Sequence, residues 1–96
     1  MNVQAIGKPV GAKLIRLSAS IEKEIVTAIS IRGDFFAIPE EGFERVEARL
    51  PGTELGKFAA RFDELLTEEG VEPYGISGAA VAEVLDDAIR AAVGLK

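Results

Sequence analysis

Two stretches near the start of the chain alternate between apolar and polar residues with a period of two. They run from Lys13 to Ile21 and from Ile25 to Arg32. This period is typical of half-buried β-strands. Only Glu22-Lys23-Glu24 separates them, so we predict an antiparallel hairpin with a connection of about three residues. We expect the apolar sides to comprise Ile15, Leu17, Ala19 and Ile21 in the first strand, and Ile25, Thr27, Ile29 and Ile31 in the second.

A shorter apolar segment, from Val3 to Ile6, predicts a third strand at the beginning of the chain. The segment Gly7-Lys8-Pro9-Val10-Gly11 follows it. Two glycines around a proline are typical of a loop. The loop either serves as a simple turn or positions Lys8 and Lys13 for binding.

Downstream, the apolar period lengthens to about 3.6 residues, which is typical of amphipathic helices. We predict helices over Pro39–Leu50, Glu54–Glu68 and Gly78–Val93, with residues 71–76 as a connector. Pro39 followed by two acidic residues marks the first helix start, and Thr53 and Ser77 are expected to cap the other two. The predicted buried stripes comprise Phe43, Val46 and Leu50; Leu55, Phe58, Ala59, Phe62, Leu65 and Leu66; and Val81, Val84, Leu85, Ala88, Ile89, Ala92 and Val93.

Strands gathered before helices predict an α+β fold. We expect a small antiparallel β-sheet of two to three N-terminal strands, covered on one face by three C-terminal helices. No linker or internal repeat divides the chain, so residues 1–96 are expected to form a single domain.

The strand pattern gives way to the helix pattern within the segment from Ser30 to Glu41. Gly33-Asp34 predicts a turn, because glycine tolerates positive φ and aspartate hydrogen-bonds to nearby backbone. Phe35 and Phe36 follow, and neighbouring side chains in an extended segment point to opposite faces. One phenylalanine is therefore expected to anchor the core and the other to cover a second surface, such as a partner's. Burial of both in one core is the alternative, and the sequence leaves open which one faces outward.

Composition narrows the chemistry that the chain can perform. The 96 residues carry a net charge of −5 and include neither cysteine nor histidine. Thiolate metal sites, cysteine nucleophiles and the usual neutral-pH general base are thereby excluded. The acidic balance argues against nucleic acid or an anionic membrane as the main partner.

Few groups of residues could carry a reaction. Asp34 near Glu40 and Glu41 could bind a divalent cation, although a turn and a helix start explain them better. Lys8 and Lys13 could meet a phosphate, but the pattern of a P-loop is absent. Adjacent acids at Asp86-Asp87 point apart on a helix and make a poor metal site. We therefore expect no catalytic, cofactor or metal site in this chain.

Several motifs together resemble the small accessory domain of lipoate–protein ligases, which in some systems is a separate protein. They are Lys8-Pro9-Val10-Gly11-Ala12-Lys13-Leu14, the alternating hairpin, Gly33-Asp34-Phe35-Phe36, Pro39-Glu40 and the connector Tyr74-Gly75-Ile76. The family's loop usually reads Pro-Gly-Gly-Lys, and here Val10 and Ala12 intrude.

The resemblance implies a non-catalytic subunit of a bipartite lipoate–protein ligase. The larger subunit would hold ATP, magnesium and lipoate, and this chain would be required for activation of lipoate to lipoyl-AMP before transfer to a lipoyl-domain lysine. The two chains would form a heterodimer. Its interface candidates are Lys8, Gly11, Lys13, Gly33, Asp34, Phe35, Phe36 and Pro39.

Two other classes of protein remain as alternatives. One is an interaction protein resembling sulfur acceptors or iron–sulfur scaffolds that has lost its cysteines. The other is an independent enzyme acting through lysines or carboxylates. No apolar run approaches the roughly 20 residues that span a bilayer, and residues 1–13 lack an apolar block of signal-peptide length. We therefore expect a cytoplasmic protein.

Overall fold

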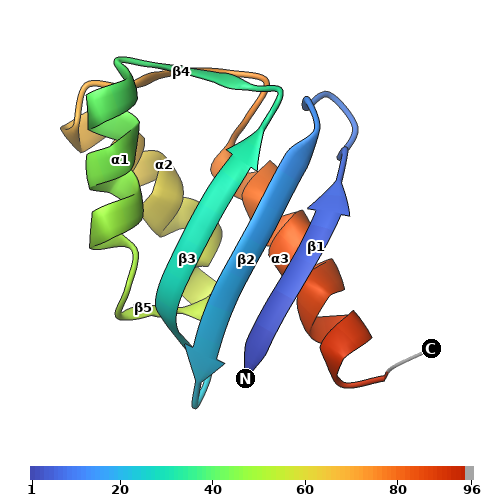
Figure 1. Ribbon diagram of the computed structural model, residues 1–96. Coiled ribbons are helices and arrows are strands. Elements are labelled where there is room, and N and C mark those ends of the chain that lie inside the picture. Colours follow the sequence, from blue (N-terminus) through green and yellow to red (C-terminus); the bar gives the residue numbers. More distant parts are fainter. Residues whose placement is uncertain (95–96) are drawn as a thin grey trace.

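The computed structural model describes residues 1–94 and confirms the predicted α+β fold, an antiparallel sheet with three helices (Figure 1). The main sheet has the strand order β1-β2-β3-β5, and a separate two-stranded ribbon pairs β4 with β6. The strands are β1 (Asn2–Gly7), β2 (Ile15–Glu22), β3 (Ile25–Gly33), β4 (Phe36–Ile38), β5 (Thr53–Glu54) and β6 (Glu72–Tyr74). The helices are α1 (Glu40–Arg49), α2 (Phe58–Glu68) and α3 (Gly78–Ala92), and a single 3-10 turn, η1 (Leu55–Lys57), precedes α2.

The apolar core lies between the main sheet and the helices. Helix α3 packs against β1 and β2, α2 packs against α3, and α1 lies beside β3 and α2 (Figure 1). The predicted inner side of β2 is confirmed, because Ile15, Leu17, Ala19 and Ile21 are all buried. The stripe of α3 is shorter than predicted. It ends at Ala88 and the half-buried Ile89, while Ala92 and Val93 are exposed.

The hairpin between β2 and β3 is confirmed, but its turn and its second strand differ from the prediction. Glu22 pairs with Ile25, so the connection is the two residues Lys23 and Glu24. Both have positive φ, at 50° and 65°, which is the requirement of the tight hairpin turn that matches strand twist.

The prediction of strict alternation along β3 was wrong, because the strand contains a bulge at Thr27. Ser20 pairs with Ala28 and Ile21 with Val26, which leaves Thr27 as an extra residue. An extra residue exchanges the two faces of a strand. Val26 is therefore buried in place of Ile25 and Thr27.

Two predicted boundaries are corrected by pairing between distant segments, and the start of the first helix shifts by one residue. Thr53 is not a helix cap: it pairs with Val26 as part of β5, so α2 begins at Phe58 rather than Glu54. Part of the predicted connector at 71–76 forms β6 with β4. Pro39 occupies the cap position just before α1. The prediction of Ser77 as a cap is confirmed, because its hydroxyl accepts a hydrogen bond from the Ala80 N–H at 3.2 Å.

Helix α1 also covers the part of β3 that has no strand beside it. Glu47 Oε2 accepts the backbone N–H of Ile31 at 2.8 Å and a guanidinium N–H of Arg32 at 2.9 Å. The carboxylate thus satisfies a strand donor that faces away from β2. Within residues 1–94, the helices are all too short or too polar to cross a bilayer.

Candidate protein-interaction site

The eight interface candidates lie at one end of the main sheet, where β1 ends, β2 begins and β3 passes into β4 (Figure 1). Two backbone hydrogen bonds join the loops there. The Lys13 N–H donates to the Gly75 carbonyl at 2.8 Å, and the Asp34 N–H donates to the Leu14 carbonyl at 2.9 Å. Segments after β1, β3 and β6 therefore meet at a single junction.

Two glycines make this junction possible. Gly33 has φ +155°, and a side chain there would overlap the Leu14 carbonyl oxygen. Gly75 has φ +82°, and a side chain there would overlap the side chain of Lys13. Glycine alone accommodates both the backbone angle and the close approach. Gly33, a sequence candidate, thus acts by letting two strand ends come together.

The two adjacent phenylalanines have opposite environments, as their extended backbone requires. Phe35 is half-buried and packs on the core, with its ring centroid 5.4 Å from that of Phe43. Phe36 is 69% exposed. The structure therefore answers the open question: Phe35 faces inward and Phe36 outward.

Phe36 belongs to an exposed apolar surface on the ribbon of β4 and β6. Ile38 lies two residues further along the same face of β4 and is 57% exposed, whereas Ala37 between them is buried. Tyr74 pairs with Phe36 across the ribbon and is 51% exposed. We call Phe36, Ile38 and Tyr74 the ribbon patch.

Sequence reasoning missed two of these three residues. The period-two pattern Phe36-Ala37-Ile38 was the available signal for Ile38, since it places Phe36 and Ile38 on one face. Nothing local indicates Tyr74, whose position depends on the pairing of β6 with β4. Its hydroxyl donates to Glu72 Oε2 at 2.7 Å, and this hydrogen bond raises the pKa of Tyr74.

A groove of about 420 Å³ runs beside the ribbon patch. Apolar lining comes from Phe35, Phe36, Ile38 and Phe43, among others. Charged lining comes from Arg32, Glu40, Glu44 and Glu47. Aromatic side chains next to a concave apolar surface are typical of the anchoring regions of protein interfaces. The groove therefore offers room for an apolar side chain of a partner.

The loop between β1 and β2 adds two cations at the same end of the sheet. Lys8 and Lys13 are exposed, and neither forms an ion pair with any residue between 1 and 94. Gly11 lies at the loop tip with φ +81°, and Val10 beside it is completely exposed. This loop presents positive charge and one apolar side chain.

Within residues 1–94, the acidic residues near the candidate site are not gathered into a group that could hold a metal ion. Asp34, Glu40 and Glu41 are exposed, and the described part of the chain contains no cluster of three or more acidic side chains that could hold a metal ion. Glu69 joins α1 to the end of α2 instead. Hydrogen bonds from Arg45 at 2.7 Å and Arg49 at 3.1 Å lower the pKa of Glu69. This group is structural.

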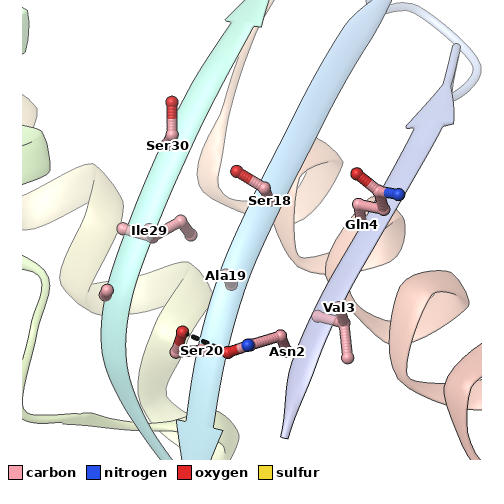
Figure 2. Close-up of a pocket in the computed structure, with 9 residues that line it drawn as sticks. Asn2, Val3, Gln4, Ser18, Ala19, Ser20, Ile29 and Ser30 are labelled. Atoms are coloured by element: carbon pink, nitrogen blue, oxygen red, sulfur yellow. Dashed lines mark hydrogen bonds between the residues drawn. The ribbon is translucent and has the colours of Figure 1, made fainter.

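The face of the main sheet opposite the helices forms a second, shallower surface (Figure 2). Its centre consists of small or uncharged polar side chains, and the Ser20 hydroxyl donates to Asn2 Oδ1 at 2.6 Å across the strands. Figure 2 shows Ser18, Ser30 and Gln4 on the neighbouring strands of the same surface. These groups can form hydrogen bonds, but they include no acid, base or activated nucleophile.

One solved structure gives a meaningful comparison. Over 94% of its length, the chain matches 93% of a chain from the archaeal lipoylation system of Thermoplasma acidophilum, with 26% sequence identity and a TM-score of 0.60. That system comprises a bi-partite lipoate protein ligase and its E2 lipoyl domain. No protein-family model matches the sequence, and no curated protein matches it. The chain thus shares its fold with one component of that system.

Proposed function

We propose that this chain is the non-catalytic accessory subunit of a bipartite lipoate–protein ligase. The observation that carries the proposal is the match to the Thermoplasma system, because it extends over nearly all of both chains. Partial matches would indicate a shared substructure, whereas this one relates the whole architecture. The candidate motifs and the resemblance of the sequence support the same assignment.

In this proposal the larger subunit holds ATP, magnesium and lipoate and performs the chemistry. A carboxylate oxygen of lipoate displaces pyrophosphate from the α-phosphorus of ATP and forms lipoyl-AMP. The amine of an acceptor lysine then displaces AMP and forms the amide. In this proposal the present chain supplies neither the nucleophile nor a general base, because both displacements take place within the larger subunit.

The contribution of this chain is to complete an enclosure. A mixed anhydride such as lipoyl-AMP is sensitive to water, and closure of a domain over an active site excludes water and orders loops. The ribbon patch is the surface we assign to the contact with the larger subunit, because exposed aromatic and aliphatic anchors supply most of the affinity of such contacts. The exposed Lys8 and Lys13 would face acidic groups or phosphate at its margin.

The test is to reconstitute the ligase from its two purified subunits. The larger subunit alone is expected to form little lipoyl-AMP, and adding this chain is expected to restore its formation. This chain alone should neither adenylate lipoate nor modify a lipoyl domain. Pyrophosphate release measures the first step, and mass spectrometry of the acceptor domain measures the second.

A variant with Phe36→Ser and Ile38→Thr tests the assigned surface, and Lys57→Gln, at an exposed position in η1 outside the proposed interfaces, serves as the matched control. The patch variant should bind the larger subunit at least tenfold more weakly, whereas the control should bind like the parent chain. Formation of lipoyl-AMP by this chain alone would refute the non-catalytic role. Unchanged adenylation by the larger subunit with and without this chain would refute the accessory role.

A further inference from the structure

Strand β1 is an edge of the main sheet, and its outer side is open (Figure 1). Met1 and Ile21 exchange two backbone hydrogen bonds, at 2.9 and 2.8 Å. Hydrogen-bonded pairs alternate along an antiparallel ladder, so Val3 and Ala5 also direct their backbone groups toward β2. The backbone N–H and C=O groups of Asn2, Gln4 and Ile6 therefore face outward, away from the sheet.

These outward groups find no hydrogen-bond partner among residues 1–94. At the opposite edge of the sheet, by contrast, some outward backbone groups of β3 do have partners. There, Val26 pairs with Thr53 of β5, and the Ile31 N–H donates to the carboxylate of Glu47. One edge is thus partly occupied by the chain itself, and the other is left open over the six residues of β1.

Strand β1 also lacks the devices that normally keep an open edge from pairing. Free edges are usually protected by lysine, proline, a bulge or an inward-pointing charge. The sequence of β1 contains no charged residue and no proline, and its pairing with β2 is regular from Asn2 to Gly7. Ile6, at the end nearest the candidate junction, is 67% exposed. The edge is therefore suited to receive another strand.

We propose that the free edge of β1 receives an extended segment of the larger ligase subunit, which continues the main sheet across the interface. This inference rests on the proposed function. Strand addition of this kind uses backbone hydrogen bonds for affinity, and the three outward residues supply three N–H donors and three C=O acceptors. Because β1 leads directly into the Lys8 loop, the added segment would end beside the candidate junction.

Charge favours a different protein over a second copy of this chain as the occupant. Helix α3 packs against β1, and its Glu83, Asp86 and Asp87 are exposed. Two-fold pairing of β1 with itself would place two copies of α3 on the same face of one sheet, with these acids close together. A partner segment flanked by lysine or arginine would instead be attracted to them.

Hydrogen exchange of individual amides tests the proposal directly. In the isolated chain, the amides of Gln4 and Ile6 should exchange rapidly, whereas those of Val3 and Ala5, which bond to β2, should be protected. On addition of the purified larger subunit, exchange at Gln4 and Ile6 should slow by at least tenfold. This alternating pattern distinguishes strand addition from contact with one face of the sheet.

A proline substitution provides a second test, since proline is tolerated in an edge strand where its missing N–H faced solvent. Gln4→Pro should weaken binding of the larger subunit at least tenfold. The matched control Gln4→Thr keeps the N–H and should bind like the parent chain. Far-ultraviolet circular dichroism confirms that both variants fold, and the exchange experiment remains decisive if Gln4→Pro does not.

The outcomes separate this inference from the proposed function. A complex that restores adenylation but leaves the Gln4 and Ile6 amides unprotected overturns the strand addition and leaves the accessory role intact. A dimer of this chain that protects the same amides overturns it in favour of a second copy. Absence of any complex, with no effect on adenylation, overturns both.

Discussion

Replacing Phe35 or Phe36 by alanine should separate the folding role of one phenylalanine from the binding role of its neighbour. Truncating a fully buried phenylalanine costs about 3–5 kcal/mol. Phe35 is half-buried and its ring packs at 5.4 Å from Phe43, and such an aromatic pair contributes about 0.5–1.5 kcal/mol. We therefore expect Phe35→Ala to lower the free energy of unfolding by about 2–3 kcal/mol.

Phe36→Ala should have a much smaller effect on folding. The side chain is 69% exposed, and the main contact it loses is the cross-strand pair with Tyr74, worth roughly 0.2–1 kcal/mol. Its effect on binding should be larger. A phenylalanine offers about 150–250 Å², so burying the exposed part at about 25 cal/mol per Å² contributes roughly 3 kcal/mol. Loss of that contribution corresponds to an approximately 100-fold weaker complex.

Urea unfolding of the isolated chain measures the first pair of values, and it requires no partner. Both variants should keep the parent m-value, so that the difference in midpoint reports stability alone. Isothermal titration with the larger subunit measures the binding effect of Phe36→Ala. Equal losses of unfolding free energy in the two variants, or a larger loss in Phe36→Ala, would refute the assigned orientations.

Three further substitutions test other parts of the fold. Gly78→Ala should lower the free energy of unfolding by about 2 kcal/mol or more, because a side chain there would overlap the Ala59 carbonyl oxygen where α2 crosses α3; a urea midpoint equal to the parent's would contradict this close approach. Glu24→Gly should raise the free energy of unfolding by about 0.5 kcal/mol, since φ is +65° at that position, and a lower melting temperature would count against the turn geometry. Glu69 has a lowered pKa through Arg45 and Arg49, so its contribution to stability is complete above its ordinary pKa of 4.5 and is lost as the pH falls through the lower folded value. Glu69→Gln should therefore flatten the acid side of a melting-temperature profile, and an unchanged profile would show that these ion pairs do not stabilise the fold.

The parts of the fold that depend on local periodicity could be predicted from the sequence. The alternation from Ile15 to Ile21 and the 3.6-residue stripes identified the buried faces of β2 and the helices. The prediction failed where pairing between distant segments overrode local signals. Thr53 reads locally as a helix cap, yet it pairs with Val26, nearly thirty residues earlier. The bulge at Thr27 was also not predicted, because a sequence pattern does not reveal how many residues of one strand lie opposite a given residue of its partner strand.

The candidate site shows the same division. The sequence indicated that Phe35 and Phe36 point apart, because this follows from extended backbone alone. Choosing the outward residue required the position of Phe43, against which Phe35 packs. Tyr74 entered the ribbon patch only through the pairing of β6 with β4. A surface that is assembled from separate segments therefore cannot be predicted from the pattern of any one segment.

Folding does not require the outward apolar side chains of the ribbon. The ribbon already contributes Ala37 to the core, and the backbone pairing of β4 with β6 would tolerate polar residues at Phe36 and Ile38. The neighbouring face of the main sheet illustrates that alternative, since its centre carries serine, asparagine and glutamine. One exposed sheet surface thus carries polar side chains, whereas the exposed face of the ribbon carries large apolar ones. Clustered exposed apolar side chains are typical of a surface that contacts another molecule. That contrast favours a binding role for the ribbon patch.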